Sequence, residues 1–334
     1  MQPEVIDPNI PLLGDEKLRR EAWVETVAPI WVSIPDRDKP LPDKVHFRAW
    51  KVGGIHLYGL HASAQTVERT GPQIASHAVD HVYFQHHLNG RAMIDASSGE
   101  TPIDGGDILV VDMAQPAFGR AFTGVDAISL CIPRRAFDAR VGEVGDLHRS
   151  VLSRRDRPLV RLFSDHIRNV RHCLDGTDEE QRTLLSVATV ALCNAALTPV
   201  SDSGYNRPAV AAIEIRQFIE ANLDRTDLGV ELLCARFGLS RTPIYALFEP
   251  EGGVMTYIRN RRLARAMRIL SGVEGGDARR ISSVAYACGY ENLKSFSKAF
   301  HARYGVNPRD VDASFRVGSR WETGTALLSW IKEL

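Results

Sequence analysis

The chain has 334 residues, of which 44% are hydrophobic and 25% charged, so it is long enough for two globular domains and is not a disordered, collagen-like or coiled-coil chain. No apolar run reaches the roughly 20 residues that cross a bilayer, no secretion signal is apparent, and five scattered cysteines without a Cys-x-x-Cys pair favour a reducing cytoplasm. The formal net charge of the chain is zero, but the charges are unevenly distributed. Residues 205–316 contain 17 Lys and Arg and 12 Asp and Glu, a net charge of +5, so the remaining residues carry −5. The electrostatic field around residues 205–316 is therefore basic.

The N-terminal part of the chain predicts one short helix followed by a run of strands. Residues 15–28 predict the helix, which Pro29 ends. From 45 to about 133, β-branched and aromatic runs alternate with glycine-containing turns, a pattern typical of a small antiparallel barrel or sandwich. Asn89-Gly90 indicates a hairpin, because both residues tolerate positive φ. Residues 1–44 are therefore expected to be an extension that precedes a β-barrel.

After the strands, the apolar residues recur with a helical period. Two stripes show this period: Phe163, Ile167, Val170 and Leu174, then Leu184, Ala188, Ala191 and Ala195. They predict two helices within 160–197, with Thr177 or Asp178 capping the second. These helices either cover the barrel or form a subunit contact. Small residues let two helix axes approach closely, so the second stripe is the expected contact of a homodimer, with core packing as the alternative.

A polar segment with proline and glycine, 198–207, predicts a linker, and the chain after it is helical. Two segments there, 230–248 and 281–300, share one design of a short amphipathic helix, a glycine turn and a second helix. The turn residues are Gly238 and Gly289. This design is typical of a helix-turn-helix, whose second helix enters a DNA major groove.

Further residues of the two segments fit the same design. Ser240 is suited to cap the second helix of the first unit. Pro243 falls in the first turn of that helix, where its missing N–H has no intrahelical partner. Ala235 and Ala285, in the first helix of each unit, are small enough for two helices to cross closely.

A predicted helix over 254–270 joins the two units. Its 17 residues span about 25 Å. When the width of the two motifs is added to this length, the two second helices are expected to lie about as far apart as successive major-groove faces, which are ~34 Å apart. One helix-turn-helix pattern is a weak indication of DNA binding, whereas two copies in a basic segment are a strong one. The arginines of the joining helix are expected to cover apolar surface or form salt bridges rather than read bases: Arg259, Arg261, Arg262, Arg265 and Arg268.

Residues 208–316 resemble the AraC/XylS family of transcription regulators. The resemblance rests on a long spaced signature of Gly238-Leu239-Ser240-Arg241, Tyr245, Leu247-Phe248, Tyr257-Ile258, Arg262-Leu263, Ala285, Cys288-Gly289-Tyr290, Ser295-Phe296-Ser297-Lys298 and Tyr304-Gly305-Val306-Asn307-Pro308. Residues 45–200 resemble, more loosely, the cupin-like sensor domain that precedes such DNA-binding domains.

The resemblance implies a two-domain α+β protein. Its N-terminal domain would be a cupin-like antiparallel β-barrel with trailing helices, and its C-terminal domain would be all-α with two helix-turn-helix motifs joined by a linker helix. The implied function is that of a cytoplasmic homodimer that binds two adjacent major-groove segments of double-stranded promoter or operator DNA and recruits RNA polymerase as an activator. Such a protein can respond to a small effector in the barrel; no effector residue is assigned, and no cofactor is expected.

The chain also departs from the family pattern. Many relatives carry basic residues where Ala246 and Glu249-Pro250-Glu251 stand here, so the first recognition helix is less cationic. The tail 317–334 has no counterpart in the pattern, and its tryptophans and leucines predict a packing helix without an assigned function.

The exposed starts of the two second helices hold the candidate DNA-binding residues. These are Arg241, Thr242 and Tyr245 in the first unit and Asn292, Lys294, Ser295 and Lys298 in the second. The expected buried stripe consists of Ile244, Leu247, Phe248, Leu293, Phe296 and Phe300. Arginine suits guanine edges and asparagine suits adenine edges, but either can contact phosphate only, and an ordinary solvated helix face is the alternative.

Four histidines, His77, His81, His86 and His87, gather near one predicted strand pair and raise the question of a metal. Enzymatic cupins use a His-x-His pattern, which occurs nowhere in the chain, so no metal is expected. No nucleophile elbow or phosphate loop is present either, so an enzyme is not expected. A cupin-type enzyme with a helical appendage is the second hypothesis, and an adaptor whose barrel only dimerises is the third.

Overall fold

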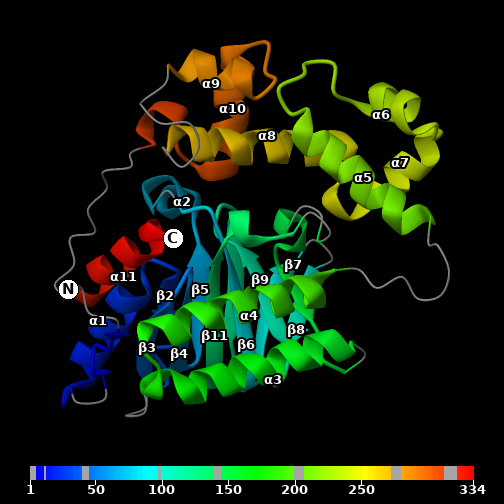
Figure 1. Cartoon of the computed structure of the whole chain (residues 1–334). Coiled ribbons are helices and arrows are strands. Elements are labelled where there is room, and N and C mark those ends of the chain that lie inside the picture. The colour runs from blue at the N-terminus through cyan, green and yellow to red at the C-terminus, as the bar shows by residue number, and fades with distance from the viewer. Residues whose placement is uncertain are drawn as a thin grey trace.

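The structure is a computed structural model that describes residues 5–10, 13–39, 45–77, 79–96, 99–138, 141, 144–155, 157–198, 207–271, 280–311 and 322–334. Figure 1 shows a body of strands with two long helices along its outside, and a second, helical body lying across one end of the strands. The predicted linker, 198–207, lies almost entirely outside the described residues.

The described strands form two antiparallel sheets. The larger sheet has the order β1 (Val5–Ile6), β3 (His46–Val52), β4 (Ile55–Ala62), β11 (Val125–Pro133), β6 (His81–Asn89), β9 (Ile108–Asp112) and β12 (Ser150–Leu152). The smaller sheet has the order β2 (Val32–Pro35), β5 (Gln65–Arg69), β10 (Ala117–Ala121), β7 (Ala92–Ala96) and β8 (Gly99–Ile103).

The larger sheet is buried on both faces, which explains why its strands read as apolar runs rather than as alternating patterns. All eight residues of β4 are buried. One face, with Tyr58 and Tyr83, packs in the core between the sheets. The other face, with Trp50 and Phe84, packs under the two long helices.

Those two helices are α3 (Pro158–Cys173) and α4 (Glu179–Leu197), and they cover the outer face of the larger sheet (Figure 1). The predicted stripe of α3, from Phe163 to Leu174, is buried against the sheet. Asp178 caps α4, as predicted, and forms a reciprocal capping box with Gln181. The stripe of small residues on α4 does not face the sheet, because Ala188 and Ala191 are exposed.

The first 44 residues are not a separate extension, as far as the structure describes them. The predicted helix is α1 (Glu16–Val27), capped by Asp15. It contributes Trp23 to the core between the sheets. Strand β1 pairs with β3 and β2 pairs with β5, so this part of the chain completes both sheets.

The predicted hairpin at Asn89-Gly90 is wrong. Strands β6 and β7 on either side of it belong to different sheets, so the chain turns a corner there rather than reversing. Gly90 has the positive φ of 95° that the sequence predicts, but a Cβ at this position would lie 2.4 Å from the carbonyl oxygen of Gly124. The predicted positive-φ turn is present, but the strands on either side of it pair with distant strands and not with each other.

A short helix, α2 (Gly71–His77), interrupts the strands where none was predicted. Thr70 precedes it and accepts a hydrogen bond from the backbone N–H of Gln73, and Pro72 occupies its first turn. Thr70 and Pro72 are residue types that favour the start of a helix, but the strand pattern of the surrounding sequence does not predict one here.

The helical body consists of α5 (Arg207–Ala221), α6 (Val230–Phe237), α7 (Arg241–Phe248), α8 (Val254–Leu270), α9 (Ile281–Ala287) and α10 (Leu293–Tyr304). It contains two apolar cores. The first lies around Leu233, Ile244 and Phe248, and the second lies around Phe296 and Phe300. Each core belongs to one of the two predicted units, and α8 contributes to both.

The chain ends in α11 (Glu322–Glu333), which packs on the barrel and not on the helical body that precedes it in sequence (Figure 1). Trp330 is 2% exposed, and its ring lies 5.7 Å from the ring of His56. His81 Nε2 lies 2.7 Å from the carbonyl oxygen of Ile331, and Lys51 pairs with Glu333 at 2.6 Å. The tail thus returns to the N-terminal domain.

We predict that Trp330→Ala destabilises the barrel by about 3–5 kcal/mol, because it removes a buried indole and leaves a cavity. Urea denaturation measures this loss as a change in the free energy of unfolding. The matched control is Thr325→Ala, an exposed position on the same helix. A Trp330→Ala protein as stable as the Thr325→Ala control would show that α11 does not pack on the barrel.

Buried histidines make the barrel sensitive to acid. Burial lowers the pKa of His56 and His77 to about 3, and of His86, His87 and His148 to about 4. The unfolded chain takes up these protons near pH 6.5, whereas the folded barrel does not until the lower pKa values are reached.

We therefore predict that the histidine contribution to stability is complete above about pH 6.5 and is lost as the pH falls towards 4. The free energy of unfolding should fall by at least about 2 kcal/mol between pH 7.5 and pH 5.0. Urea titrations at a series of pH values measure it. A constant free energy over this interval would contradict the burial of neutral imidazoles.

Candidate nucleic-acid interface

The first helix-turn-helix unit is built from α6 and α7. Gly238 ends α6 with a φ of 65°, and its backbone N–H donates to the carbonyl of Cys234. This left-handed conformation favours glycine and confirms the predicted turn. Ser240 stands at the N-cap position of α7 as predicted, but its side chain makes no capping hydrogen bond.

The predicted contact residues of α7 lie on its exposed face. Arg241 is 64% exposed in its side chain and pairs with Glu231 at 2.9 Å. Thr242 is exposed, and Tyr245 is 50% exposed. An exposed ion pair contributes little to stability. Arg241 could therefore leave Glu231 and pair with a DNA phosphate at a small cost in free energy.

The second unit is built from α9 and α10, with Gly289 between them. Gly289 has a φ of 70°, and a Cβ there would lie 2.4 Å from the carbonyl oxygen of Leu223 and 2.8 Å from the guanidinium of Arg262. Only glycine fits both the conformation and the space. The predicted turn is therefore confirmed, with the added reason of a close contact to the end of α5.

Asn292 has a structural role that the sequence interpretation missed. It is the N-cap of α10, and its Oδ1 accepts hydrogen bonds from the backbone N–H groups of Lys294 at 2.7 Å and Ser295 at 3.3 Å. Only its Nδ2 remains to donate to a partner outside the helix. The signal was available, because asparagine just before an apolar helical stripe is a preferred N-cap residue.

Lys294, Ser295 and Lys298 form an exposed polar face on α10. Within the described ranges, no acidic side chain pairs with either lysine. Each ammonium group can therefore move freely towards a phosphate or a base edge.

The structure corrects two details of the predicted faces. Leu293, expected in the buried stripe, is 41% exposed because it is the first residue of α10. Ala235 is exposed, whereas Ala285 is fully buried, so only the second unit uses a small residue where its helices pack. Ile244, Phe248, Phe296 and Phe300 are buried as predicted, and Leu247 is half-buried.

Helix α8 fixes the two units relative to each other. Tyr257 and Ile258 lie in the core of the first unit, and Leu263 and Met267 lie in the core of the second. Three of its arginines make structural contacts of the kind that the sequence predicted. Arg261 pairs with Glu220, Arg262 Nε donates to the carbonyl of Leu223 at 3.1 Å, and Arg268 lies 3.6 Å from Asp80 of the barrel.

The barrel docks on the helical body through α2. Ile74 and Ala75 of α2 are buried in the apolar core of the second unit, with Phe296, Phe300 and Tyr304. Gly71 lies so close to α10 that a Cβ there would lie 1.9 Å from the carbonyl oxygen of Tyr304. The two bodies therefore share a core at this point.

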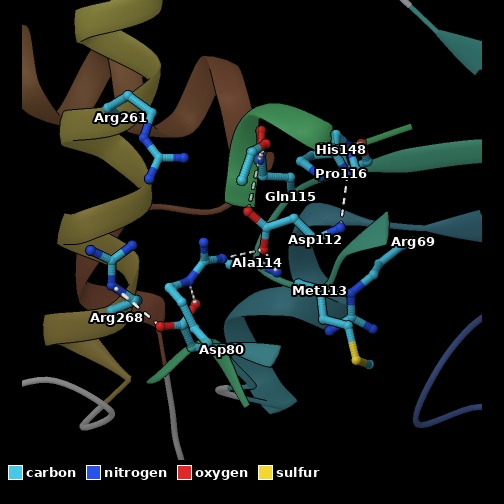
Figure 2. A network of polar contacts seen from close by, with 12 residues as sticks. Arg69, Asp80, Asp112, Met113, Ala114, Gln115, Pro116, His148, Arg261 and Arg268 are labelled. Atoms are coloured by element: carbon cyan, nitrogen blue, oxygen red, sulfur yellow. Dashed lines mark hydrogen bonds and ion pairs between the residues drawn. The ribbon is translucent and has the colours of Figure 1, made fainter. Parts of the chain in front are cut away.

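A polar network runs beside this apolar contact. Figure 2 shows Arg268 reaching from α8 to Asp80, with Asp112, Gln115 and His148 beside it on the barrel. Arg134 joins the two acids, at 2.7 Å from Asp80 and 2.7 Å from Asp112.

The network continues to α10, because Gln115 donates to Asp112 at 2.8 Å and accepts from Arg303 at 3.0 Å. Burial alone would raise the pKa of Asp112, but the charge of Arg134 and the hydrogen bonds from Gln115 and the backbone N–H of Ala114 lower that pKa well below its usual range. Asp112 is thus a buried anion held by Arg134 and by hydrogen bonds within the barrel.

The four clustered histidines each have a separate partner. His77 Nδ1 lies 3.2 Å from the carbonyl oxygen of Pro29, and His81 contacts α11. His86 Nε2 lies 2.7 Å from Ser164 Oγ, and His87 Nε2 lies 3.1 Å from Gln85 Oε1. In the part of the chain that the structure describes, no three His, Cys, Asp or Glu side chains converge as a metal site would require. The described helices also include none that is long and apolar enough to span a bilayer.

Comparison with known proteins places both halves of the chain. Residues 233–314 match the helix-turn-helix domain family, and residues 20–198 match the AraC-binding-like domain family. The second match alone spans more than half of the chain. The chain belongs to the AraC family.

Individual relatives agree with this assignment. The chain is 30% identical over 111 residues to the transcriptional activator RhrA of Rhizobium meliloti, which covers 33% of each protein. It is 31% identical over 96 residues to the probable transcriptional regulator LumQ of Photobacterium leiognathi, covering 28% of this chain and 37% of LumQ. The chain therefore aligns with only about a third of these relatives' length.

A solved structure extends the likeness over both domains of this AraC family member. The AraC-like transcriptional activator CuxR is 25% identical, with a TM-score of 0.50, and the match covers 78% of this chain and 94% of CuxR. The two-domain α+β fold, with an N-terminal domain of β-sheets and a C-terminal helical domain, is therefore confirmed.

Proposed function

We propose that the chain is a sequence-specific DNA-binding transcription regulator. In this proposal α7 and α10 enter two adjacent major-groove segments of promoter or operator DNA. The observation that carries it is the pair of helix-turn-helix units, each with an exposed polar face on its second helix, held at a fixed separation by α8. In the proposal, residues 208–316 bind DNA, and the predicted sensing and dimerisation domain, 45–197, is extended by the preceding residues that complete its sheets.

The DNA-contacting set is the predicted one: Arg241, Thr242, Tyr245, Asn292, Lys294, Ser295 and Lys298. Lys294 and Lys298 are proposed as the strongest electrostatic contacts, because they are exposed and without an acidic partner among the described residues. Asn292 contributes mainly by capping α10 and so orienting the lysines.

Activation is the proposed mode of action, with RNA polymerase as the partner and the cytoplasm as the location. The names of RhrA and CuxR, both transcriptional activators, support this direction. A cupin-type enzyme is the weaker alternative, because the four histidines that could have supplied ligands are each held by a structural partner.

The interior of the barrel is the family's expected place for a small effector. It contains a cavity of about 60 Å³ lined by Trp31, Tyr83, Gln85 and Met93, among others. This volume holds about two water molecules, whereas drug-sized ligands occupy about 300–1,000 Å³. An effector inside the barrel must therefore displace side chains that now fill it.

Dimerisation is proposed to use the exposed face of α4. Leu184 is 64% exposed and Val187 is 65% exposed, and Ala188 and Ala191 continue the same face at helical spacing. Leu159 on α3 is 38% exposed and lines the same surface hollow as Val187 and Ala191. A two-fold partner that buries this face against itself would remove apolar surface from water at about 25 cal/mol per Å².

Replacing Lys294 by alanine tests the DNA interface. We expect operator binding to weaken by about 1–3 kcal/mol if the ammonium group contacts a base, or the salt dependence of binding to fall by about one unit if it contacts a phosphate. A gel-shift titration at several salt concentrations, with DNA from upstream of the protein's own gene, measures both. Lys17→Ala, an exposed lysine on α1, is the charge-matched control.

The same titration with Asn292→Ser separates capping from base contact, because serine keeps the N-cap and removes the amide. Loss of affinity in this variant would assign a base contact to the amide. If Lys294→Ala and the charge-matched control bind the operator equally tightly and equally specifically, the assignment of α10 as a recognition helix is wrong.

The dimer contact is tested by Ala191→Arg, which places a charge in the middle of the exposed α4 face. We expect a folded monomer by light scattering, with unchanged helix content and weaker binding to an operator with two half-sites. Glu100→Arg, on the exposed strand β8, should remain a dimer. A dimer that survives Ala191→Arg would place the subunit contact elsewhere.

A further inference from the structure

A second and larger cavity lies between the barrel and the helical body. Its volume is about 690 Å³, within the range of small-molecule sites. One wall is the barrel segment that contains Gln115, His148 and Arg149, and the other wall is formed by α8 and α10. We call it the interdomain cavity.

Guanidinium groups converge on this cavity from three elements. Arg149 comes from the barrel, Arg259 and Arg261 come from α8, and Arg303 comes from α10. Figure 2 shows Arg261 pointing from α8 towards the barrel. The walls are therefore rich in the side chain that proteins use most for planar anions.

Arg261 pairs with Glu220, whereas Arg149 and Arg303 form no ion pair among the described residues. The two carboxylates that line the cavity, Asp146 and Glu251, lie 3.1 Å and 2.8 Å from a fifth arginine, Arg216. Tyr257 also donates its hydroxyl hydrogen to Asp146, at 3.1 Å. Asp146 is thus engaged by Arg216 and Tyr257, and Glu251 is engaged through Oε1 alone, because its buried Oε2 has no hydrogen-bond partner among the described residues.

Arg149 and Arg303 have unused donors. Arg149 donates to the carbonyl of Asp95 at 2.8 Å and Arg303 donates to Gln115 at 3.0 Å, but the buried Nε of each has no hydrogen-bond partner among the described residues. A guanidinium group has five N–H donors, so a ligand in the cavity can accept from accessible N–H groups that these bonds leave unused. The two guanidinium groups also repel each other: burial is the main cause of the lowered pKa of Arg149, and the charge of Arg303 adds to it.

The backbone at Arg149 is strained. Its φ is 63°, in the left-handed region that side chains other than glycine, asparagine and aspartate rarely adopt. The strained conformation holds an arginine, where glycine would fit without cost, at the edge of the cavity. Strain of this kind gathers at ligand-binding positions.

We propose that the interdomain cavity binds a compact polyanion, a small molecule with at least two negative charges on phosphate or carboxylate groups, that bridges Arg149 of the barrel and Arg303 of α10. Charge-assisted, forked hydrogen bonds from guanidinium groups suit these oxyanions. The lining holds one aromatic residue, Tyr257, whose hydroxyl is engaged by Asp146.

Such a ligand would contact both domains at once, so it would stabilise the docked arrangement by mass action. This regulatory consequence rests on the proposed function, whereas anion binding does not. The proposal also gives an effector a site that needs no opening of the nearly filled barrel.

Isothermal titration calorimetry on the full-length protein without DNA tests the binding, with pyrophosphate and citrate as probes at constant ionic strength. We expect saturable binding of at least one probe, weakened at least about tenfold by Arg149→Gln and by Arg303→Gln. Tighter binding of pyrophosphate would assign a phosphate ligand, and tighter binding of citrate a carboxylate ligand. Arg161→Gln, exposed on α3 far from the cavity, should bind as the wild type does.

Arg149→Gly guards against misfolding as an explanation. It relieves the left-handed strain and removes the cation, so we expect an unchanged or higher Tm together with lost anion binding. Saturable anion binding that survives in both Arg149→Gly and Arg303→Gln would overturn the proposal. Failure of both pyrophosphate and citrate to bind the wild-type protein would also overturn it.

Lys294→Ala distinguishes this site from the proposed DNA surface, which also attracts anions. We expect this variant to retain pyrophosphate or citrate binding. Loss of anion binding in Lys294→Ala but not in Arg149→Gln would place the anion on the exposed DNA-binding face of α10. This result would overturn the interdomain site. Failure of operator binding both with and without the polyanion would instead count against the proposed function alone.

Discussion

The contact between α2 and α10 determines how the two domains of this protein sit together. Gly71 brings the start of α2 against the backbone of Tyr304, at a distance that leaves no room for a side chain. Ile74 then enters the core of the second helix-turn-helix unit. Because protein cores are close-packed, this contact behaves as one arrangement and not as a continuous range of positions. The interdomain cavity and the contacts of Arg268 and Arg303 with the polar network exist only in the docked arrangement.

The polar network adds specificity to this apolar contact. Asp112 is fully buried, so its charge is tolerated only because Arg134, His148 and Gln115 surround it. Arg268 and Arg303 reach the same network from the helical body. Any event that moves the barrel relative to α8 must therefore separate charged partners. Helix α11, which follows the helical body in the sequence, packs in the core of the barrel. The helical body is therefore connected to the barrel domain through both its N-terminal and its C-terminal ends.

The sequence predicted what depends on local pattern and failed where partners are distant. The turns at Gly238 and Gly289, the cap at Asp178 and the range of the joining helix could be read from neighbouring residues. The corner at Gly90 was misread as a hairpin, because a turn signal does not say which strands will pair. Helix α2 was missed for a similar reason: seven residues inside a strand pattern carry little periodicity, and their importance comes from a domain far along the chain. The dual role of Asn292 as cap and candidate contact was likewise visible only once the cap geometry was known.

The most direct test of this account is the shape of the protein when Gly71 is replaced by alanine. A methyl group there would lie 1.9 Å from the carbonyl oxygen of Tyr304, so the domains must separate. Small-angle X-ray scattering measures the radius of gyration, with Gly176→Ala, which has open space around it, as the control. We expect a larger radius of gyration for Gly71→Ala than for the wild type and the control, with unchanged secondary structure by circular dichroism. Identical scattering curves for all three proteins would contradict the docking of α2 on α10.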